Sequence, residues 1–86
     1  MKFDNKKEIR VGTVVQINDW NWYNNTLKDD YGYIRFEKIV FNPEMSKYLG
    51  KQYTVKEVNS SYGFIFYRLN GINFLWNELM FRVIKY

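Results

Sequence analysis

The chain has 86 residues and a formal net charge of +4, and 21% of its residues are aromatic. This length is enough for one small domain, residues 1–86, and leaves no room for a second core. The sequence contains no cysteine, which excludes disulfides and thiolate metal sites, and it contains no alanine, which argues against a mainly helical protein.

The cellular location is inferred from what the sequence lacks. Residues 1–7 are polar and have no apolar stretch of the kind found in signal peptides. No apolar run approaches the roughly 20 residues of a membrane-spanning helix. A chain without cysteine also suits a reducing compartment. We therefore expect a cytoplasmic protein that does not contact a membrane.

The N-terminal half begins with a predicted strand over residues 8–17, in which Val11, Thr13, Val15 and Ile17 alternate with other residues. Gly12 is expected to mark a bend in this strand. Residues 18–41 form a long aromatic loop, with a short strand within residues 31–36. Loops of this length are usually functional or packed on themselves.

A short helix is predicted over residues 43–49. Asn42 can cap its N-terminus, Pro43 suits the first helical position, and Gly50 is a natural stop. A strand follows over residues 51–58, and residues 59–61 are expected to turn the chain.

Asn70 and Gly71 lie between two alternating apolar runs, which predicts a type I′ hairpin of residues 62–69 with residues 72–76. The implied register pairs Tyr67 with Phe74. It places one set of apolar residues on a shared, buried face: Ile65, Tyr67, Leu69, Ile72, Phe74 and Trp76. A tight helical turn over 77–80 and a last strand over 81–86 complete the chain.

This order of elements resembles the SH3-like barrel. The resemblance implies a mainly β fold: a five-stranded barrel with a long RT-type loop at residues 18–41 and one or two short helical turns. The second half also resembles small phage and prophage proteins with SH3-like folds. The matching residues are Pro43-Glu44-Met45, Tyr48, Gly50-Lys51, Tyr53-Thr54-Val55, Tyr67, Leu69, Trp76, Glu78-Leu79-Met80 and Phe81.

Catalysis has little support in the sequence. Histidine and cysteine, the commonest general base and the commonest activated nucleophile, are both absent. Asp29 and Asp30 are adjacent, but neighbours on an extended chain point to opposite sides and do not form an acid/base pair. We expect a protein without catalytic residues, metal or cofactor.

Two aromatic groups are candidate binding residues. In an extended loop, Trp20 and Trp22 would share one side, next to Tyr23. These rings either form a platform for a ligand or fold back as a lid on a small core. The other group is the back of the predicted hairpin, which is either an exposed contact surface or is covered by residues 18–40. It consists of Phe64, Phe66 and Leu75, with Arg68 beside them.

Cations near these aromatics leave two functions open. Arg35 and Arg68 could neutralise phosphates next to stacking rings, which is what single-stranded nucleic acid requires, or they could be solvated surface charges. We expect a non-catalytic binding module, either monomeric or weakly homodimeric. The phage resemblance implies that it binds and modulates a host macromolecule in the host cytoplasm, a protein or a protein–nucleic acid complex, for example by inhibiting a defence nuclease. The alternative is a small barrel that binds single-stranded nucleic acid.

Overall fold

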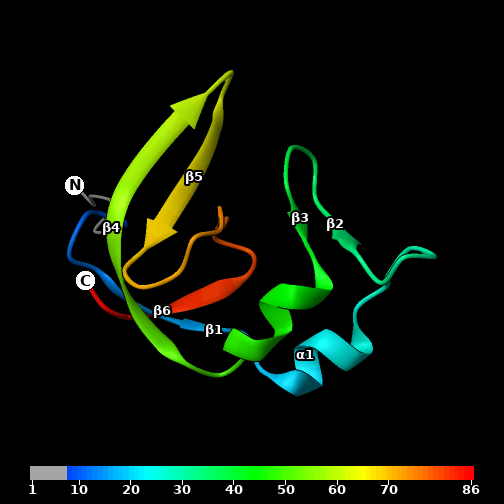
Figure 1. Ribbon diagram of the computed structural model, residues 1–86. Coiled ribbons are helices and arrows are strands. Elements are labelled where there is room, and N and C mark those ends of the chain that lie inside the picture. Colours follow the sequence, from blue (N-terminus) through cyan, green and yellow to red (C-terminus); the bar gives the residue numbers. More distant parts are fainter. Residues whose placement is uncertain (1–7) are drawn as a thin grey trace, which may run out of the picture.

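The computed structural model describes residues 8–86 and is mainly β, as predicted (Figure 1). Its elements are β1 (Val14–Ile17), α1 (Trp20–Asn25), β2 (Ile34–Arg35), β3 (Val40–Phe41), the 3₁₀ helix η1 (Pro43–Tyr48), β4 (Gln52–Ser61), β5 (Phe64–Leu69) and β6 (Phe81–Lys85).

The strands form two separate antiparallel sheets. Four strands lie in the order β5-β4-β1-β6, and β2 pairs with β3 alone. The four-stranded sheet lies on one side of the molecule, and α1, η1 and the β2–β3 pair lie on the other (Figure 1). Within the described residues the two sheets do not close into one barrel, so the mainly β class is confirmed, whereas the five-stranded SH3-like barrel stays a prediction.

The core fills the space between these two layers. Phe41 is fully buried at its centre, because the alternation in β3 turns this ring inward. Its ring centroid lies 5.2 Å from that of Trp22, 5.7 Å from that of Tyr23 and 5.9 Å from that of Trp76. The contacts with Trp22 and Trp76 are edge-on, a geometry that adds stabilisation beyond the buried area. A small domain thus obtains much of its core from a few large rings.

The first strand is shorter than predicted, because Gly12 bends the chain before it. Gly12 has a φ of +99°, and its amide donates to the carbonyl of Val55 at 2.8 Å. Thr13 follows as a fully buried residue whose Oγ1 accepts from the amide of Arg10 at 2.9 Å. The expected bend is confirmed, and regular pairing starts only at Val14.

The predicted helix start at residue 42 is confirmed. The Asn42 side chain accepts a hydrogen bond from the amide of Met45 at 3.2 Å, and Pro43 occupies the first helical position of η1. Met45 and Leu49 are buried, and Gly50 follows with a φ of +78°, a conformation that favours glycine. η1 thereby closes one side of the core.

The type I′ turn lies at Tyr62 and Gly63, and the turn predicted at 59–61 is wrong. Tyr62 has a φ of +52° and Gly63 a φ of +84°, and the flanking residues Ser61 and Phe64 pair directly. Positive φ at both central residues is what a two-residue type I′ hairpin requires. β4 therefore extends three residues further than predicted, and the long β4–β5 hairpin projects beyond β1 and β6 (Figure 1).

The predicted hairpin at Asn70-Gly71 is wrong in its turn type and its register. Only Gly71 has a positive φ there, and the amide of Ile72 donates to the carbonyl of Leu69 at 3.3 Å. Tyr67 pairs with Trp76 instead of Phe74, so β5 ends at Leu69 and residues 70–75 form a loop instead of a ladder. The buried face is largely right, since Tyr67, Leu69, Ile72 and Trp76 are buried, but Ile65 is exposed.

Candidate binding site

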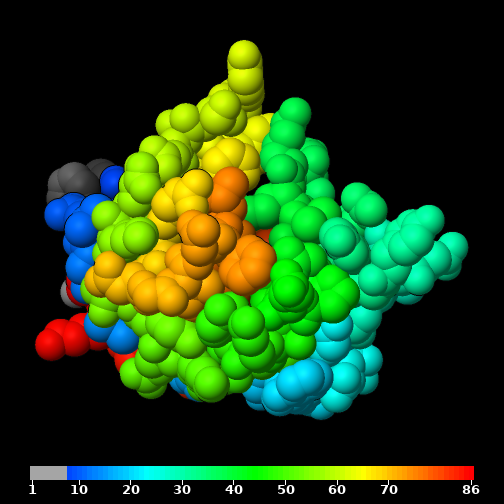
Figure 2. All heavy atoms as spheres, in the orientation of Figure 1, coloured from blue at the N-terminus to red at the C-terminus, as the bar shows by residue number. Residues whose placement is uncertain are grey.

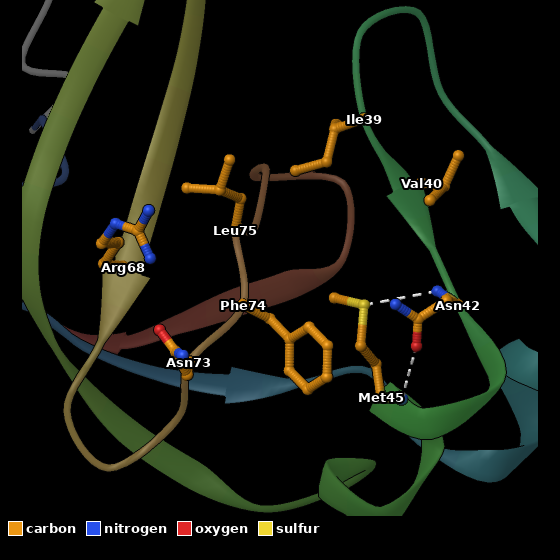
Figure 3. A pocket seen from close by; sticks show the side chains of 8 residues that line it. All are labelled: Ile39, Val40, Asn42, Met45, Arg68, Asn73, Phe74 and Leu75. Atoms are coloured by element: carbon orange, nitrogen blue, oxygen red, sulfur yellow. Dashed lines mark hydrogen bonds between the residues drawn. The ribbon is translucent and has the colours of Figure 1, made fainter.

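An open pocket of about 440 Å³ lies between β5 and residues 73–75 on one side and β3 and η1 on the other (Figure 3). The loop after β5 places Phe74 and Leu75 between that strand and β3, and η1 presents Met45 from the opposite side (Figure 3). The lining residues are Ile39, Val40, Asn42, Met45, Arg68, Asn73, Phe74 and Leu75.

A second pocket of about 240 Å³ lies between β5 and the turn that joins β2 to β3. Ile39 lines both pockets, so the two adjoin at this residue. We call them together the apolar cleft. The second pocket is lined by Phe36, Glu37, Lys38, Ile39, Phe64, Ile65, Phe66, Asn77 and Leu79.

The apolar side chains of the cleft are incompletely covered. Phe64 and Phe66 are half-buried, whereas Leu75 is 37% exposed, Ile65 is 49% exposed and Leu79 is 64% exposed. In the space-filling view, β5 and residues 73–75 meet the surface of β3 and η1 on this face of the molecule (Figure 2). Apolar side chains gathered around one concavity are typical of contact surfaces, in contrast to single exposed residues scattered over a protein.

The cations at the cleft already have partners. The Nζ of Lys38 lies 5.3 Å from the centroid of the Phe64 ring, a cation–π distance. The Nε of Arg68 lies 3.6 Å from Oε1 of Glu57, its cross-strand neighbour on β4. The positive charges therefore do not form a continuous basic surface along the cleft.

The two tryptophans of the loop do not share a side, because residues 20–25 are helical and not extended. Asp19 caps α1 by accepting from the amide of Trp22 at 3.0 Å. Trp22 and Tyr23 then pack against Phe41 as a lid on the core, while Trp20 is 54% exposed. Residues two apart on a helix face different directions, so a shared Trp20–Trp22 platform is absent.

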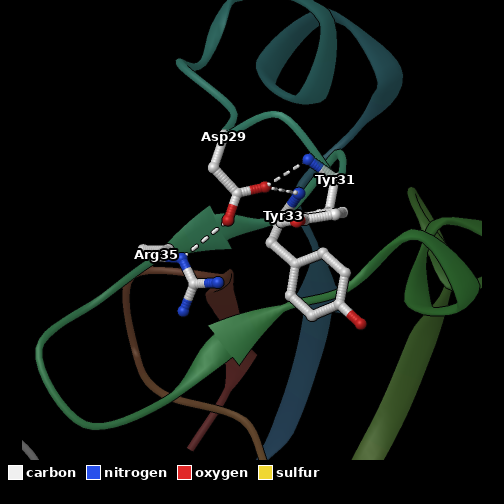
Figure 4. Close-up of polar contacts among 4 residues, drawn as sticks. All are labelled: Asp29, Tyr31, Tyr33 and Arg35. Carbon is white, nitrogen blue, oxygen red and sulfur yellow. Dashed lines mark hydrogen bonds and ion pairs between the residues drawn. The ribbon is translucent and has the colours of Figure 1, made fainter.

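Arg35 is held by Asp29 in the loop that leads to β2 (Figure 4). One oxygen of the Asp29 carboxylate accepts from the amides of Tyr31 at 2.9 Å and Tyr33 at 3.0 Å, and the other oxygen accepts from Nε of Arg35 at 2.6 Å. The hydrogen bond from the Tyr33 amide, with those from Tyr31 and Arg35, lowers the pKa of Asp29 below its usual value. Arg35 of β2 is thus tied to the preceding loop through Asp29.

Four of the eight predicted binding residues line the same surface. Phe64, Phe66, Arg68 and Leu75 all line the apolar cleft. The rest lie elsewhere: Trp20, Trp22 and Tyr23 are on α1, and Arg35 is on β2. Trp22 lines a separate pocket of about 160 Å³ beside Arg82, whose Nη2 donates to Oε1 of Gln16 at 2.9 Å.

The opposite wall of the cleft was missed from the sequence. Phe36 and Ile39 flank the tight turn between β2 and β3, and the amide of Phe36 donates to the carbonyl of Ile39 at 2.9 Å. The two apolar residues bracket the charged pair Glu37 and Lys38, which is the pattern of a short hairpin. The alternative that residues 18–40 cover the back of the hairpin is therefore correct in part.

Residues 8–86 contain no group of three or more acidic, cysteine or histidine side chains placed to hold a metal ion. Among the helices of this same region, none has the length and apolar character needed to cross a membrane. No protein-family model, curated protein sequence or solved structure matches the chain.

Proposed function

We propose that this protein is a non-catalytic binding module whose contact surface is the apolar cleft. The observation that carries the proposal is the incomplete burial of Leu75, Ile65 and Leu79 around a concavity. A chain of this size gains stability by burying apolar area, at about 25 cal/mol per Å², so apolar side chains left around a cleft favour a partner that covers them.

The charges favour a protein partner over nucleic acid. Arg35 is bonded to Asp29, and Arg68 lies 3.6 Å from Glu57. A single-stranded nucleic acid needs free cations beside stacking rings, and each of these two cations has a carboxylate beside it instead. Binding is therefore proposed to rest on apolar contact with a protein. Single-stranded nucleic acid is the alternative ligand, and nuclease treatment distinguishes the two.

The origin and target of the module are proposed from the residues of its second half alone. The matching positions of residues 43–81 resemble those of small phage and prophage proteins with SH3-like folds, and this resemblance supports a phage or prophage source. Such a protein would act in a bacterial host by binding a host protein or a protein–nucleic acid complex, and inhibition of a defence nuclease is one such action.

A capture experiment with matched variants tests the proposal. Immobilised wild type, Leu75→Glu and Leu27→Glu are exposed to bacterial lysate, with one half of each sample treated with nuclease. Leu75 lies in the cleft, whereas Leu27 is 90% exposed and does not line it, so both variants add one charge at an exposed leucine. The proposal predicts a nuclease-resistant partner that Leu75→Glu loses and Leu27→Glu keeps. Equal capture by all three proteins, or capture that nuclease abolishes, would contradict it.

A further inference from the structure

β5 is an edge of the four-stranded sheet, and part of its backbone is unpaired. The amide of Tyr67 donates to the carbonyl of Trp76 at 2.8 Å, and the amide of Trp76 donates back at 2.9 Å. These bonds lie on the side of β5 that faces away from β4. Because backbone groups alternate sides along an antiparallel strand, the amide and carbonyl of Ile65, two residues away, point to the same side.

No segment of the described chain continues the pairing that Trp76 begins. The chain leaves the edge of β5 at Asn77, where it enters the turn closed by the bond from the Met80 amide to the Asn77 carbonyl at 3.1 Å. Within residues 8–86 the backbone of Ile65 has no hydrogen-bond partner along this edge. The second pocket of the cleft lies at this position, since Ile65, Asn77 and Leu79 all line it.

The residues around Ile65 at the edge of β5 carry no net charge, and this indicates which kind of ligand would bind there. Residues 58–67, which form the projecting part of the hairpin, contain no charged side chain. The opposite edge strand, β6, carries Arg82 and Lys85, the kind of charge that discourages edge pairing. Beside the pocket, Glu37 and Lys38 have opposite charges. This edge has no net positive charge that would attract a polyanion. An uncharged segment, in contrast, is complementary to the uncharged edge of β5.

We propose that an extended, uncharged and apolar segment of a partner protein adds to the edge of β5 at Ile65 and places a side chain in the second pocket. The segment continues the ladder that Tyr67 and Trp76 begin, so its backbone binds Ile65 while Phe36, Ile39 and Phe66 receive its side chain. Main-chain bonds supply affinity and the pocket supplies selectivity in this mode of recognition. The inference rests on the proposed function and specifies its partner.

A displayed library of random eight-residue peptides provides the probe. Peptides selected on the wild type are synthesised with a fluorophore, and their affinities are measured by anisotropy for wild type, Ile65→Pro and Ser60→Pro. Proline is tolerated on a strand where the lost amide faces away from the ladder. Ser60 is the cross-strand partner of Ile65 and has an equivalent outward amide on β4, away from the pocket, so Ser60→Pro is the matched control.

We expect neutral, apolar peptides whose affinity falls by about tenfold or more in Ile65→Pro, as the loss of a backbone hydrogen bond and of close approach implies, and is unchanged in Ser60→Pro. In the wild type, bound peptide should slow hydrogen exchange of the Ile65 amide, while the Phe66 amide, in the ladder with Asn59, serves as the internal reference. This second readout does not depend on the folding of either variant.

Several results would overturn the edge pairing. These are selection of no peptide, equal binding to Ile65→Pro, or an Ile65 amide that exchanges as fast in the complex as in the free protein. A concentration-dependent dimer that Ile65→Pro abolishes would assign the edge to a second copy of the chain. If the lysate partner still depends on Leu75 in any of these cases, the proposed function stands and only the edge pairing fails.

Discussion

The Asp29 carboxylate accepts three hydrogen bonds from its own part of the chain. Its carboxylate joins Tyr31, Tyr33 and Arg35 into one ordered loop (Figure 4). Since the folded state lowers the pKa of this group, Asp29 stabilises the protein above the pKa of the unfolded chain. That contribution is lost as the pH falls through the lowered value.

Asp29→Asn tests this contribution. The variant keeps one acceptor oxygen and loses the charge that pairs with Arg35, so we expect a lower melting temperature than wild type at pH 7 and a difference that shrinks towards pH 2. Thermal unfolding followed by circular dichroism over this range measures it. Asp30→Asn removes the same charge one residue away, without these bonds. A constant difference between Asp29→Asn and wild type across the range would show that the carboxylate charge is irrelevant.

Phe41 is a fully buried ring at the centre of the core. Truncation to alanine removes a fully buried ring that contacts Trp22, Tyr23 and Trp76. We expect Phe41→Ala to lower the free energy of unfolding by about 3–5 kcal/mol in urea denaturation. Tyr31→Ala truncates a ring that is 79% exposed, and its effect should stay within about 0.5 kcal/mol. Similar losses in the two variants would refute the central place of Phe41.

At the scale of elements, the β4–β5 hairpin contains a strained turn. Tyr62 has a φ of +52°, a left-handed conformation that is unfavourable for most side chains and favourable for asparagine. Its ring is 94% exposed, so no packing compensates for the strain. A residue that favours the left-handed conformation at position 62 is therefore expected to stabilise the hairpin.

We expect Tyr62→Asn to raise the free energy of unfolding by about 0.5–1 kcal/mol, because it creates the Asn-Gly pair preferred in type I′ turns. Urea denaturation measures the change. Gly63→Ala should have the opposite effect, since Gly63 has a φ of +84° with open space around it and the cost is purely conformational. A destabilised Tyr62→Asn variant would mean that the ring makes a contact that its exposure does not reveal.

The elements that sequence patterns predicted well are those fixed by local chemistry. Asn42 and Pro43 begin η1 as expected, and the last strand predicted over residues 81–86 is β6. The hairpin was misplaced because Asn70-Gly71 matches the preferred turn and Tyr62-Gly63 does not. The choice between them depends on the pairing of β5 with β4, which no short pattern encodes.

The candidate site could be predicted only on the wall that β5 and its following loop provide. The alternation of Phe64, Phe66 and Leu75 with the residues of the expected buried face predicted this wall. The opposite wall comes from Ile39 and Phe36, and the position of that hairpin against β5 is a tertiary contact. The predicted platform of Trp20 and Trp22 is absent because Asp19 caps a helix where an extended loop was expected.

At the scale of the whole molecule, the distribution of charge predicts how binding depends on salt. The net charge is +4, but the cations nearest the cleft are paired with a carboxylate or with an aromatic ring. We expect the affinity for the captured partner to change by less than about threefold between 50 and 200 mM NaCl. A contact with several phosphates would lose about 10³-fold or more over the same range. A titration at fixed pH distinguishes the two, and a steep loss would favour nucleic acid.

The cleft itself is tested most directly by amide chemical-shift mapping of the ¹⁵N-labelled protein with the captured partner. A binding surface at the apolar cleft predicts that the largest shifts fall on Ile39, Phe66 and Leu75, on both walls together. Trp20 and Tyr31, which are exposed but lie outside both pockets, should remain unshifted. Shifts concentrated on α1 and the Asp29 loop, with the cleft unperturbed, would contradict the proposed site.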